Sequence, residues 1–465
     1  MYFSSLIFLF LYLPAVLLGY YAAPRRFRNG FLLLVNLIFY GWGEPVFILI
    51  MALSITANYI CGLFIERYRS SERLAKTFVV LSVVISLGLL GIFKYTNFLT
   101  GLLRQIPFLS FLPKTNIPLP IGISFYTFQA MSYTIDVYRG DTKAQRSIVS
   151  FGTYVSFFPQ LIAGPIVRYR DIAEQLMHRR ESIGDFANGI RRFTVGLCKK
   201  VLIANQMGMY WDLLRDMGAG GGTLGAWLGI IGYTFQIYFD FSAYSDMAIG
   251  LGKMFGFEFV ENFNYPYISK SITEFWRRWH ISLSTWFRDY VYIPLGGNRC
   301  KLGRHIFNLL VVWLLTGFWH GANINFILWG LYFFLLLAGE KFVYGKLLER
   351  MPAVVKHVYS LFFIVLGWVL FYFEDFGQLS AFTMNLFGST GKIIGHDALS
   401  VTLSYLPLLL TAAIGSTPLP KLIHARLKNH RFCGAAEIIL CTAALLLCTA
   451  SLVSQSYNPF LYFRF

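Results

Sequence analysis

The sequence has few charged residues and few cysteines. Asp, Glu, Lys and Arg make up 14% of its 465 residues, against about 25% in a typical soluble domain. No hydrophilic stretch is long enough to form a large extramembrane domain. The six cysteines form no C-x-x-C pair, and no His/Cys cluster has zinc spacing. We therefore infer neither a disulfide framework nor a structural metal.

Several widespread motifs are also missing. The chain has no G-x-S-x-G elbow, no Walker lysine motif and no H-E-x-x-H, so the enzyme classes that depend on these motifs are not indicated. Gly220–Gly225 fits G-x-G-x-x-G, but no strand precedes it and no β-α-β unit surrounds it. A dinucleotide site is therefore not predicted.

Long apolar runs make up most of the sequence. Hydrophobic residues make up 56%, including 46 Phe, 28 Tyr and 10 Trp. The apolar runs predict an all-α polytopic membrane protein, with roughly ten to thirteen membrane helices in a single domain over residues 1–465. Several runs are short or contain Gly, Pro and polar residues, so we expect some helices to be tilted, broken or re-entrant. The runs cover residues 3–23, 30–43, 45–65, 77–97, 118–138, 148–166, 189–208, 224–252, 306–322, 324–343, 355–376, 400–415 and 435–455.

The basic residues lie between the apolar runs. The formal net charge is +17, which in a soluble protein would suggest a nucleic-acid partner. Here clusters such as Arg25–Arg28, Arg67–Lys76 and Arg277–Arg304 flank membrane segments, so we expect cytoplasmic loops and no nucleic acid. Such a face binds anionic head groups of the lipid bilayer, and it could equally attract a phosphate-bearing donor.

A histidine lies inside one apolar run. His320 belongs to residues 311–331, which contain no Asp, Glu, Lys or Arg. An ionisable side chain at membrane depth is costly and normally faces a bundle interior or a water-filled cavity. In a continuous helix, Thr316, His320 and Asn323 would share one face, and a G-x-x-x-G pair beginning at Gly317 would let another helix pack closely. A histidine that is merely satisfied by a neighbouring helix explains this stretch equally well.

Two other regions are too polar for helices that face lipid. For residues 120–138 we expect the polar groups to satisfy one another and to fix helix packing. Residues 238–246 contain Asp240 and Asp246, and a buried aspartate must be hydrogen-bonded or change its protonation. These two carboxylates either have the same structural role or line a functional cavity.

A third polar region, residues 271–289, combines arginine with tryptophan. Arg277 and Arg278 alternate with tryptophans such as Trp276, which predicts an amphipathic segment at a membrane interface. His280 closes this basic run, and by itself it would be an ordinary interfacial histidine.

Six ordered stretches are similar to motifs of one enzyme family. The chain resembles the membrane-bound O-acyltransferases, in particular the bacterial branch of alginate O-acetyltransferase membrane subunits, with teichoic-acid D-alanyl transferase membrane subunits as a cousin branch. The resemblance implies a ring of tilted and re-entrant helices around a central tunnel, in the bacterial cytoplasmic membrane. The stretches are 120–129, 158–166, 238–247, 274–283, 317–321 and 458–465.

The resemblance also implies roles for particular residues. His320 takes the position of the catalytic histidine, and His280 takes a second, more variable position. Acetyl-CoA would be the donor, entering from the cytoplasm near Arg277, Arg278, Arg299 and Arg304, with no bound cofactor. A separate extracytoplasmic partner of the SGNH type would complete the transfer to an exported polysaccharide.

Acyl transfer from a thioester to a hydroxyl needs a base for the alcohol proton and stabilisation of the oxyanion. We expect neutral His320 to be that base, with Thr316 or Asn323 orienting its ring. His280 would orient, bind or polarise at the other mouth of the tunnel. Trp276, Asp240 and Asp246 are further candidates for lining the tunnel or binding the donor.

Two alternatives remain open at this point. The acyl group could be D-alanine, delivered by a carrier protein to a polymer of the teichoic-acid type. The chain could also be a transporter or flippase with a gated polar path, although the inverted repeats typical of transporters are not visible in the sequence.

Overall fold

The computed structural model describes residues 2–427, 429, 432–454, 457–458 and 460–461, which form helices and contain no β-strand. Seven helices within these residues are long and apolar enough to cross a membrane, and the shorter Phe8–Ala22 is also apolar. The all-helical, polytopic prediction is therefore confirmed. The seven are Ile48–Arg67, Glu72–Leu103, Leu302–His320, Ile324–Arg350, Ala353–Tyr372, His396–Gly415 and Cys433–Ser454.

The chain divides into two compact units, and α10 and α12 each contribute residues to both. Unit 1 comprises Met1–Phe193 and Tyr244–Val260, and unit 2 comprises Thr194–Ala243 and Glu261–Phe465. The helices that begin in unit 1 are α1 (Leu13–Ala22), α2 (Arg28–Gly41), α3 (Ile48–Arg67), α4 (Glu72–Leu90), α5 (Thr96–Leu103), α6 (Ile123–Arg139), α7 (Ile148–Ser156), α8 (Phe158–Leu161), α9 (Tyr169–Met177) and α10 (Ile183–Cys198).

The helices that begin in unit 2 include the short pair α13 and α14. They are α11 (Asn205–Asp216), α12 (Gly222–Met254), α13 (Ile272–Arg278), α14 (Ile281–Phe287), α15 (Leu302–His320), α16 (Ile324–Gly339), α17 (Gly345–Arg350), α18 (Ala353–Tyr372), α19 (Phe376–Leu386), α20 (His396–Gly415), α21 (Leu419–Leu427) and α22 (Cys433–Ser454). Segments of π-helix extend several of these helices, at η1 (Phe8–Tyr12), η3 (Gly91–Tyr95), η5 (Lys199–Ala204), η8 (Arg288–Tyr292) and η9 (Glu340–Tyr344).

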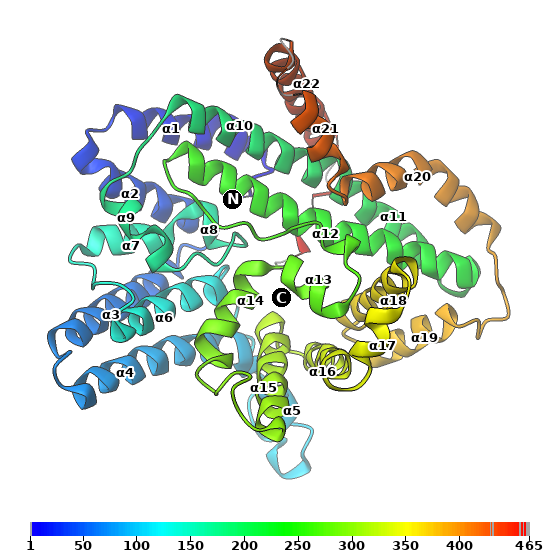
Figure 1. Cartoon of the computed structure of the whole chain (residues 1–465), viewed down its shortest axis with the longest axis horizontal. Coiled ribbons are helices and arrows are strands. Elements are labelled where there is room, and N and C mark those ends of the chain that lie inside the picture. The colour runs from blue at the N-terminus through cyan, green and yellow to red at the C-terminus, as the bar shows by residue number, and fades with distance from the viewer. Residues whose placement is uncertain (1, 428, 430–431, 455–456, 459, 462–465) are drawn as a thin grey trace. The chain divides into compact units, whose positions relative to one another are not determined.

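In unit 1, a closed cluster of polar side chains joins α3, α4 and α6, which lie side by side in Figure 1. The Asn58 amide donates to Ser86 Oγ (3.1 Å), and its oxygen accepts from Ser82 Oγ (2.6 Å). Ser82 also lies 2.8 Å from Thr134 Oγ1. All four side chains are buried. Hydrogen bonds of this kind join helices where apolar side chains gain little from contacting one another instead of lipid.

The polar region predicted over residues 120–138 folds as α6, and its charge is paired. Asp136 is fully buried, and its carboxylate lies 3.6 Å from Arg170 of α9. This ion pair joins α6 to α9, as expected for a role in helix packing. The prediction that the polar groups of the region satisfy one another is wrong for Gln129, whose buried side-chain amide has no hydrogen-bond partner within the described residues.

In unit 2, α15 and α16 cross at very short range. A Cβ atom on Gly317 would overlap the main-chain oxygen of Phe326, and one on Gly330 would overlap that of Trp313. Glycine is therefore needed on both helices, and the close packing predicted for Gly317 is confirmed. The crossing lies one turn before His320.

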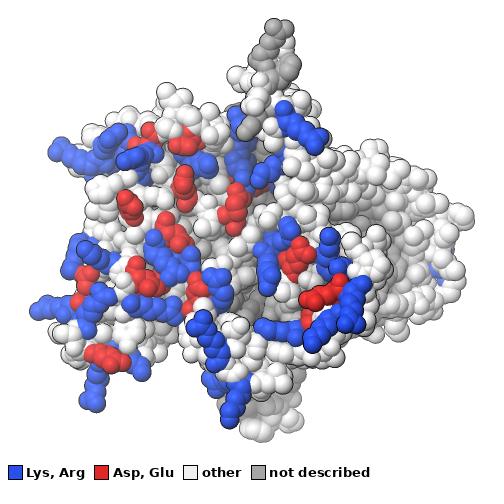
Figure 2. Space-filling model, in the orientation of Figure 1, with Lys and Arg blue, Asp and Glu red and all other residues white. Residues whose placement is uncertain are grey.

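The surface agrees with a membrane protein that has basic loops. Lys and Arg predominate among the charged side chains on the face drawn in Figure 2, as expected from 40 Lys and Arg against 23 Asp and Glu. Large areas of the same face carry no charge. Helix α22 buries only 6% of its apolar stretch within the protein, so the remainder suits contact with lipid.

Candidate active site

His320 is the last residue of α15. Gly321 is extended, with φ −163° and ψ 155°, and this conformation ends the helix. The imidazole is buried, with 6% of the residue exposed. The α15–α16 crossing fixes the preceding turn, so the position of His320 is set by close helix packing rather than by a loop.

Aromatic rings surround the His320 imidazole. The ring centroids of Trp319 and Trp329 each lie 5.1 Å from it, and that of Phe371 lies 5.5 Å away. All three rings are close to perpendicular to the imidazole, at 77–82°. Edge-to-face contacts of this kind restrict how the imidazole can turn.

The two residues expected to orient His320 lie in different surroundings. The Thr316 hydroxyl donates to a main-chain oxygen of its own helix (2.8 Å). Asn323 lies beyond the helix end, and its amide donates to Glu374 (3.4 Å). The prediction that Asn323 shares a helical face with His320 is wrong, because extended Gly321 interrupts the helix between them.

A second element of the site, α13, is anchored at its first turn. Ser271 Oγ accepts a hydrogen bond from the main-chain N–H of Glu274 (2.9 Å). The carboxylate of Glu340, on η9, accepts from the main-chain N–H groups of Ile272 (2.6 Å) and Thr273 (2.8 Å). An acidic group at a helix N-terminus satisfies otherwise unpaired donors and complements the helix dipole. Sequence reasoning missed Glu340, since its partners are 67 and 68 residues away.

The tryptophans of α13 and its C-terminus are buried in protein. The ring of Trp276 lies 5.4 Å from that of Trp329, and Trp279 packs at 4.9 Å from Trp368. Their prediction as interfacial residues is therefore corrected, because an amphipathic pattern does not distinguish a protein neighbour from lipid. Arg277 is exposed, whereas Arg278 forms an ion pair with Glu274 (2.9 Å).

His280 lies between α13 and α14 with a left-handed backbone, at φ 45°. Its Nδ1 lies 3.1 Å from Asn262 Oδ1. Its ring packs edge-on against Phe241 (4.7 Å) and against Trp319 (5.9 Å). Burial lowers the pKa of His280 well below its ordinary value, and nearby His320 lowers it further, so this imidazole is neutral at neutral pH.

The two histidines therefore belong to one aromatic cluster. Trp319 contacts both imidazoles, with ring centroids 5.9 Å from His280 and 5.1 Å from His320. The expected place of His280 at the other mouth of a tunnel stays a prediction.

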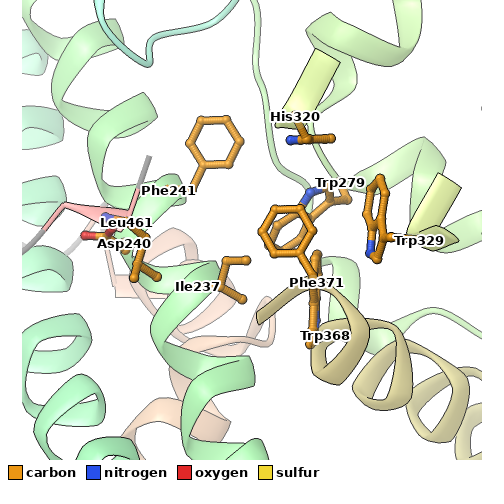
Figure 3. A pocket seen from close by; sticks show the side chains of 9 residues that line it. All are labelled: Ile237, Asp240, Phe241, Trp279, His320, Trp329, Trp368, Phe371 and Leu461. Atoms are coloured by element: carbon orange, nitrogen blue, oxygen red, sulfur yellow. Dashed lines mark hydrogen bonds between the residues drawn. The ribbon is translucent and has the colours of Figure 1, made fainter. Parts of the chain in front are cut away.

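A cavity opens beside this cluster within unit 2 (Figure 3). Figure 3 shows Asp240 and Leu461 on one side of the cavity, and His320 with Trp329, Trp368 and Phe371 on the other. The lining residues are Ile237, Asp240, Phe241, Trp279, His320, Trp329, Trp368, Phe371 and Leu461.

The carboxylate on the cavity wall is paired. Asp240 Oδ1 lies 2.6 Å from Lys200 Nζ, and both side chains are almost completely buried. Asp240 Oδ2 accepts from the main-chain N–H of Leu461 (2.9 Å). The two charges cancel, so this wall presents polar atoms without a net charge. The sequence did not predict the contacts of Asp240 with Lys200 and Leu461, because these residues are 40 and 221 positions away along the chain.

The other candidate aspartate of α12 has its own partner. Asp246 lies six residues after Asp240, and it pairs with Arg192 of α10 at 2.6 Å. Asp246 is not among the residues that line the described cavity. Its contact with Arg192 connects the parts of α10 and α12 that belong to unit 1.

One group in the described part of the chain could hold a metal ion. His424, Cys433 and Glu437 place a ligand-type atom each within 4.8 Å of one another. His424 Nε2 lies 2.5 Å from the Glu437 carboxylate, and His424 is exposed. Sequence spacing did not reveal this group, since its members lie on two different helices, α21 and α22.

Comparison with known proteins identifies the family. The sequence model of MBOAT, the membrane-bound O-acyltransferase family, matches residues 142–374. A probable alginate O-acetylase of Pseudomonas aeruginosa is 47% identical over 385 residues, which cover 81% of this chain and 72% of that protein. Another from Azotobacter vinelandii is 42% identical over 507 residues and covers both chains completely. A peptidoglycan O-acetyltransferase of Helicobacter pylori is 33% identical over 430 residues, covering 85% and 81%.

The matched region contains α13 to α16 and both histidines of the aromatic cluster. The apolar helices and the bacterial relatives agree with a multi-pass protein of the bacterial cytoplasmic membrane. The chain belongs to the membrane-bound O-acyltransferase family and is an acyltransferase.

Proposed function

We propose that this chain takes an acetyl group from cytoplasmic acetyl-CoA and passes it across the membrane for O-acetylation of an exported polysaccharide. His320 is the general base of the transfer. The observation that carries the proposal is a buried imidazole on the wall of an aromatic cavity, in a chain whose relatives are named as O-acetylases.

The chemistry requires one base and balances without a cofactor. His320 accepts the proton of the attacking hydroxyl while its oxygen bonds to the thioester carbonyl carbon. The carbon–sulfur bond then breaks, and the departing thiolate takes the proton to leave as a thiol. A positioned base accelerates such a step by roughly 10²–10⁴-fold, or about 3–5 kcal/mol.

The lining of the cavity favours a small acyl group. It consists mostly of bulky aromatic side chains, so we propose that only the acetyl thioester end of acetyl-CoA enters and that the nucleotide remains outside. Arg277, Arg299 and Arg304 are exposed and are our candidates for contacting its phosphates, whereas Glu274 already pairs with Arg278.

The paired charges at Asp240 also support an uncharged substrate. A carboxylate that Lys200 neutralises neither attracts nor repels a neutral thioester. D-alanine brings an ammonium group, which the compensated wall does not favour. An acetyl group therefore fits this cavity better than a D-alanyl group.

The relatives support an exported polymer as the acceptor. They are named for acetylation of alginate or of peptidoglycan, which are both polymers of the cell exterior. We propose that an extracytoplasmic protein of the SGNH type receives the acetyl group and completes the transfer, so that the chain itself connects the two sides of the membrane.

The experiment is complementation of a deletion strain, with O-acetyl and D-alanyl esters measured separately on its envelope polymers. The wild-type chain should restore O-acetyl esters, and His320→Ala should not, although it inserts normally. His305→Gln is the matched control, because His305 is buried on the same helix and bonded to Tyr292 (2.8 Å). Normal acetylation with His320→Ala, or restoration of D-alanyl esters alone, would overturn the proposal. Polymer export that depends on the chain but not on His320 would favour a transporter.

A further inference from the structure

Asn262 holds both the backbone and the ring of His280. It is fully buried, and its main-chain oxygen accepts from the N–H of Ile281 (3.0 Å). Its side-chain oxygen accepts from the N–H (3.2 Å) and the hydroxyl (2.8 Å) of Ser282. The same oxygen lies 3.1 Å from His280 Nδ1. Asn262 therefore holds the backbone that follows His280 through its main-chain oxygen, and holds the His280 ring and Ser282 through its side-chain oxygen.

These contacts determine which imidazole nitrogen carries the proton. The main-chain N–H of Ser282 can only donate, so the Asn262 atom that faces it must be the amide oxygen. That oxygen can only accept, so the neighbouring Nδ1 of His280 must be the donor. A neutral imidazole with its proton on Nδ1 has its lone pair on Nε2.

We propose that Asn262 is a positioning residue, which holds neutral His280 in the tautomer protonated at Nδ1 so that Nε2 accepts a proton or a hydrogen bond during acyl transfer. The role of Nε2 rests on the proposed function, whereas the tautomer can be measured without it. Neither Asn262 nor His280 lines the described cavity, but the His280 ring packs against Phe241, which does; Asn262 acts through His280.

An amide suits this position better than a carboxylate. A carboxylate could accept the same hydrogen bonds, but its charge would favour the protonated imidazole. The amide orients the ring without adding charge. Phe241 of α12 and Trp319 of α15, which pack on the His280 ring, are uncharged. His320 is the titratable neighbour that acts on His280, and it opposes protonation.

The first test is ¹⁵N-histidine NMR on the purified full-length protein in lipid, with the His280 signals assigned by their loss in His280→Gln. Protonated and bare ring nitrogens give well-separated ¹⁵N signals. Wild type should show a protonated Nδ1 and a bare Nε2, and Asn262→Leu should lose this preference. A proton on Nε2 in wild type, or an unchanged tautomer in a folded Asn262→Leu variant, would overturn the proposal.

The second test is the pH profile of acetyl transfer in Asn262→Asp, which keeps all three acceptor contacts. The added charge raises the pKa of His280, so more of the ring is protonated at neutral pH. The acidic limb of kcat/KM should therefore move up by about 1–3 pH units, with activity recovering at high pH. A purely structural Asn262 would leave the limb in place, and that result would count against the proposal.

A double variant identifies which imidazole responds. In Asn262→Asp combined with His280→Gln, the shift of the limb should vanish. A shift that persists would place the effect on His320 and would reject the role of Asn262. A chain without acetyltransferase activity would fail both pH experiments while leaving the NMR result unchanged, so the two proposals fail separately.

Discussion

Two buried polar clusters of this chain differ in what their polar atoms contact: other protein atoms in one cluster, and a cavity in the other. In unit 1, Asn58 and its serine partners on α4 form a closed network in which hydrogen bonds connect helices. In unit 2, the polar atoms of His320 and Asp240 lie on the wall of a cavity. Both sets of residues interrupt apolar sequence in the same way. The difference teaches that a polar residue in a membrane helix indicates function only where its neighbours leave space for a substrate.

The largest effect on stability is expected at the charged wall of the cavity. Lys200→Met would leave the Asp240 carboxylate buried without its cation, which costs about 3–5 kcal/mol. Adding Asp240→Asn should recover most of this loss, because the amide oxygen can still accept from Leu461. Thermal unfolding of the purified protein measures the change, with Lys199→Met as the neighbouring control. A Lys200→Met protein as stable as wild type would show that the ion pair of Lys200 and Asp240 is not buried as described.

The next effect separates helix packing from chemistry. Gly317→Ala inserts a methyl group against the main chain of α16, and overpacking of this kind costs about 1–3 kcal/mol. Activity should also fall, because the crossing sets the position of His320. Gly303→Ala is the control on the same helix, since a Cβ there meets no atom within 4 Å. If the two variants had the same stability and the same activity, the α15–α16 crossing would not determine the position of His320.

A change in the closed cluster should affect stability alone. Asn58→Leu removes hydrogen bonds between α3 and α4, at about 0.6–1.7 kcal/mol each, without touching the cavity. O-acetyl ester levels at a permissive temperature should match wild type while unfolding shifts downward. Thr77→Val, on the exposed face of α4, is the control. Loss of esters from a stably inserted Asn58→Leu protein would break the distinction between the two clusters.

The smallest effect is expected at the basic surface. Arg277→Ala should raise the KM for acetyl-CoA by about two- to fivefold with little change in kcat, since an exposed charge contributes up to about 1 kcal/mol. The effect should weaken with added salt. Arg278→Ala should change KM less, because Glu274 already neutralises that charge. Steady-state kinetics on the two variants tests the ranking, and a larger effect at Arg278 would reverse it.

The sequence predicted what depends on neighbours along the chain. Seven of the thirteen apolar runs coincide with described helices that are long and apolar enough to cross a membrane, fewer than the ten to thirteen predicted. The glycine at 317 predicted the close packing of α15. The lone histidine in an apolar run pointed to the residue that lines the cavity. These predictions hold because length, composition and helical spacing are local properties.

The remaining features depend on contacts between distant segments. Asn262 and His280 are 18 residues apart, and Lys200 and Asp240 are 40 apart, so no spacing rule brings them together. Asn323 was misplaced because one extended glycine changes which residues share a face. The tryptophans of α13 were wrongly predicted to lie at the membrane interface, because an amphipathic sequence pattern suits both lipid and protein neighbours.

The most direct test of the account measures thioester consumption by the purified chain in proteoliposomes, supplied with acetyl-CoA and a hydroxyl acceptor. We expect His320→Gln to lower the rate by roughly 10²–10⁴-fold, while His305→Gln stays near the wild-type rate and both variants remain folded. A His320→Gln protein that releases coenzyme A as fast as wild type would contradict the central claim that this imidazole is the base.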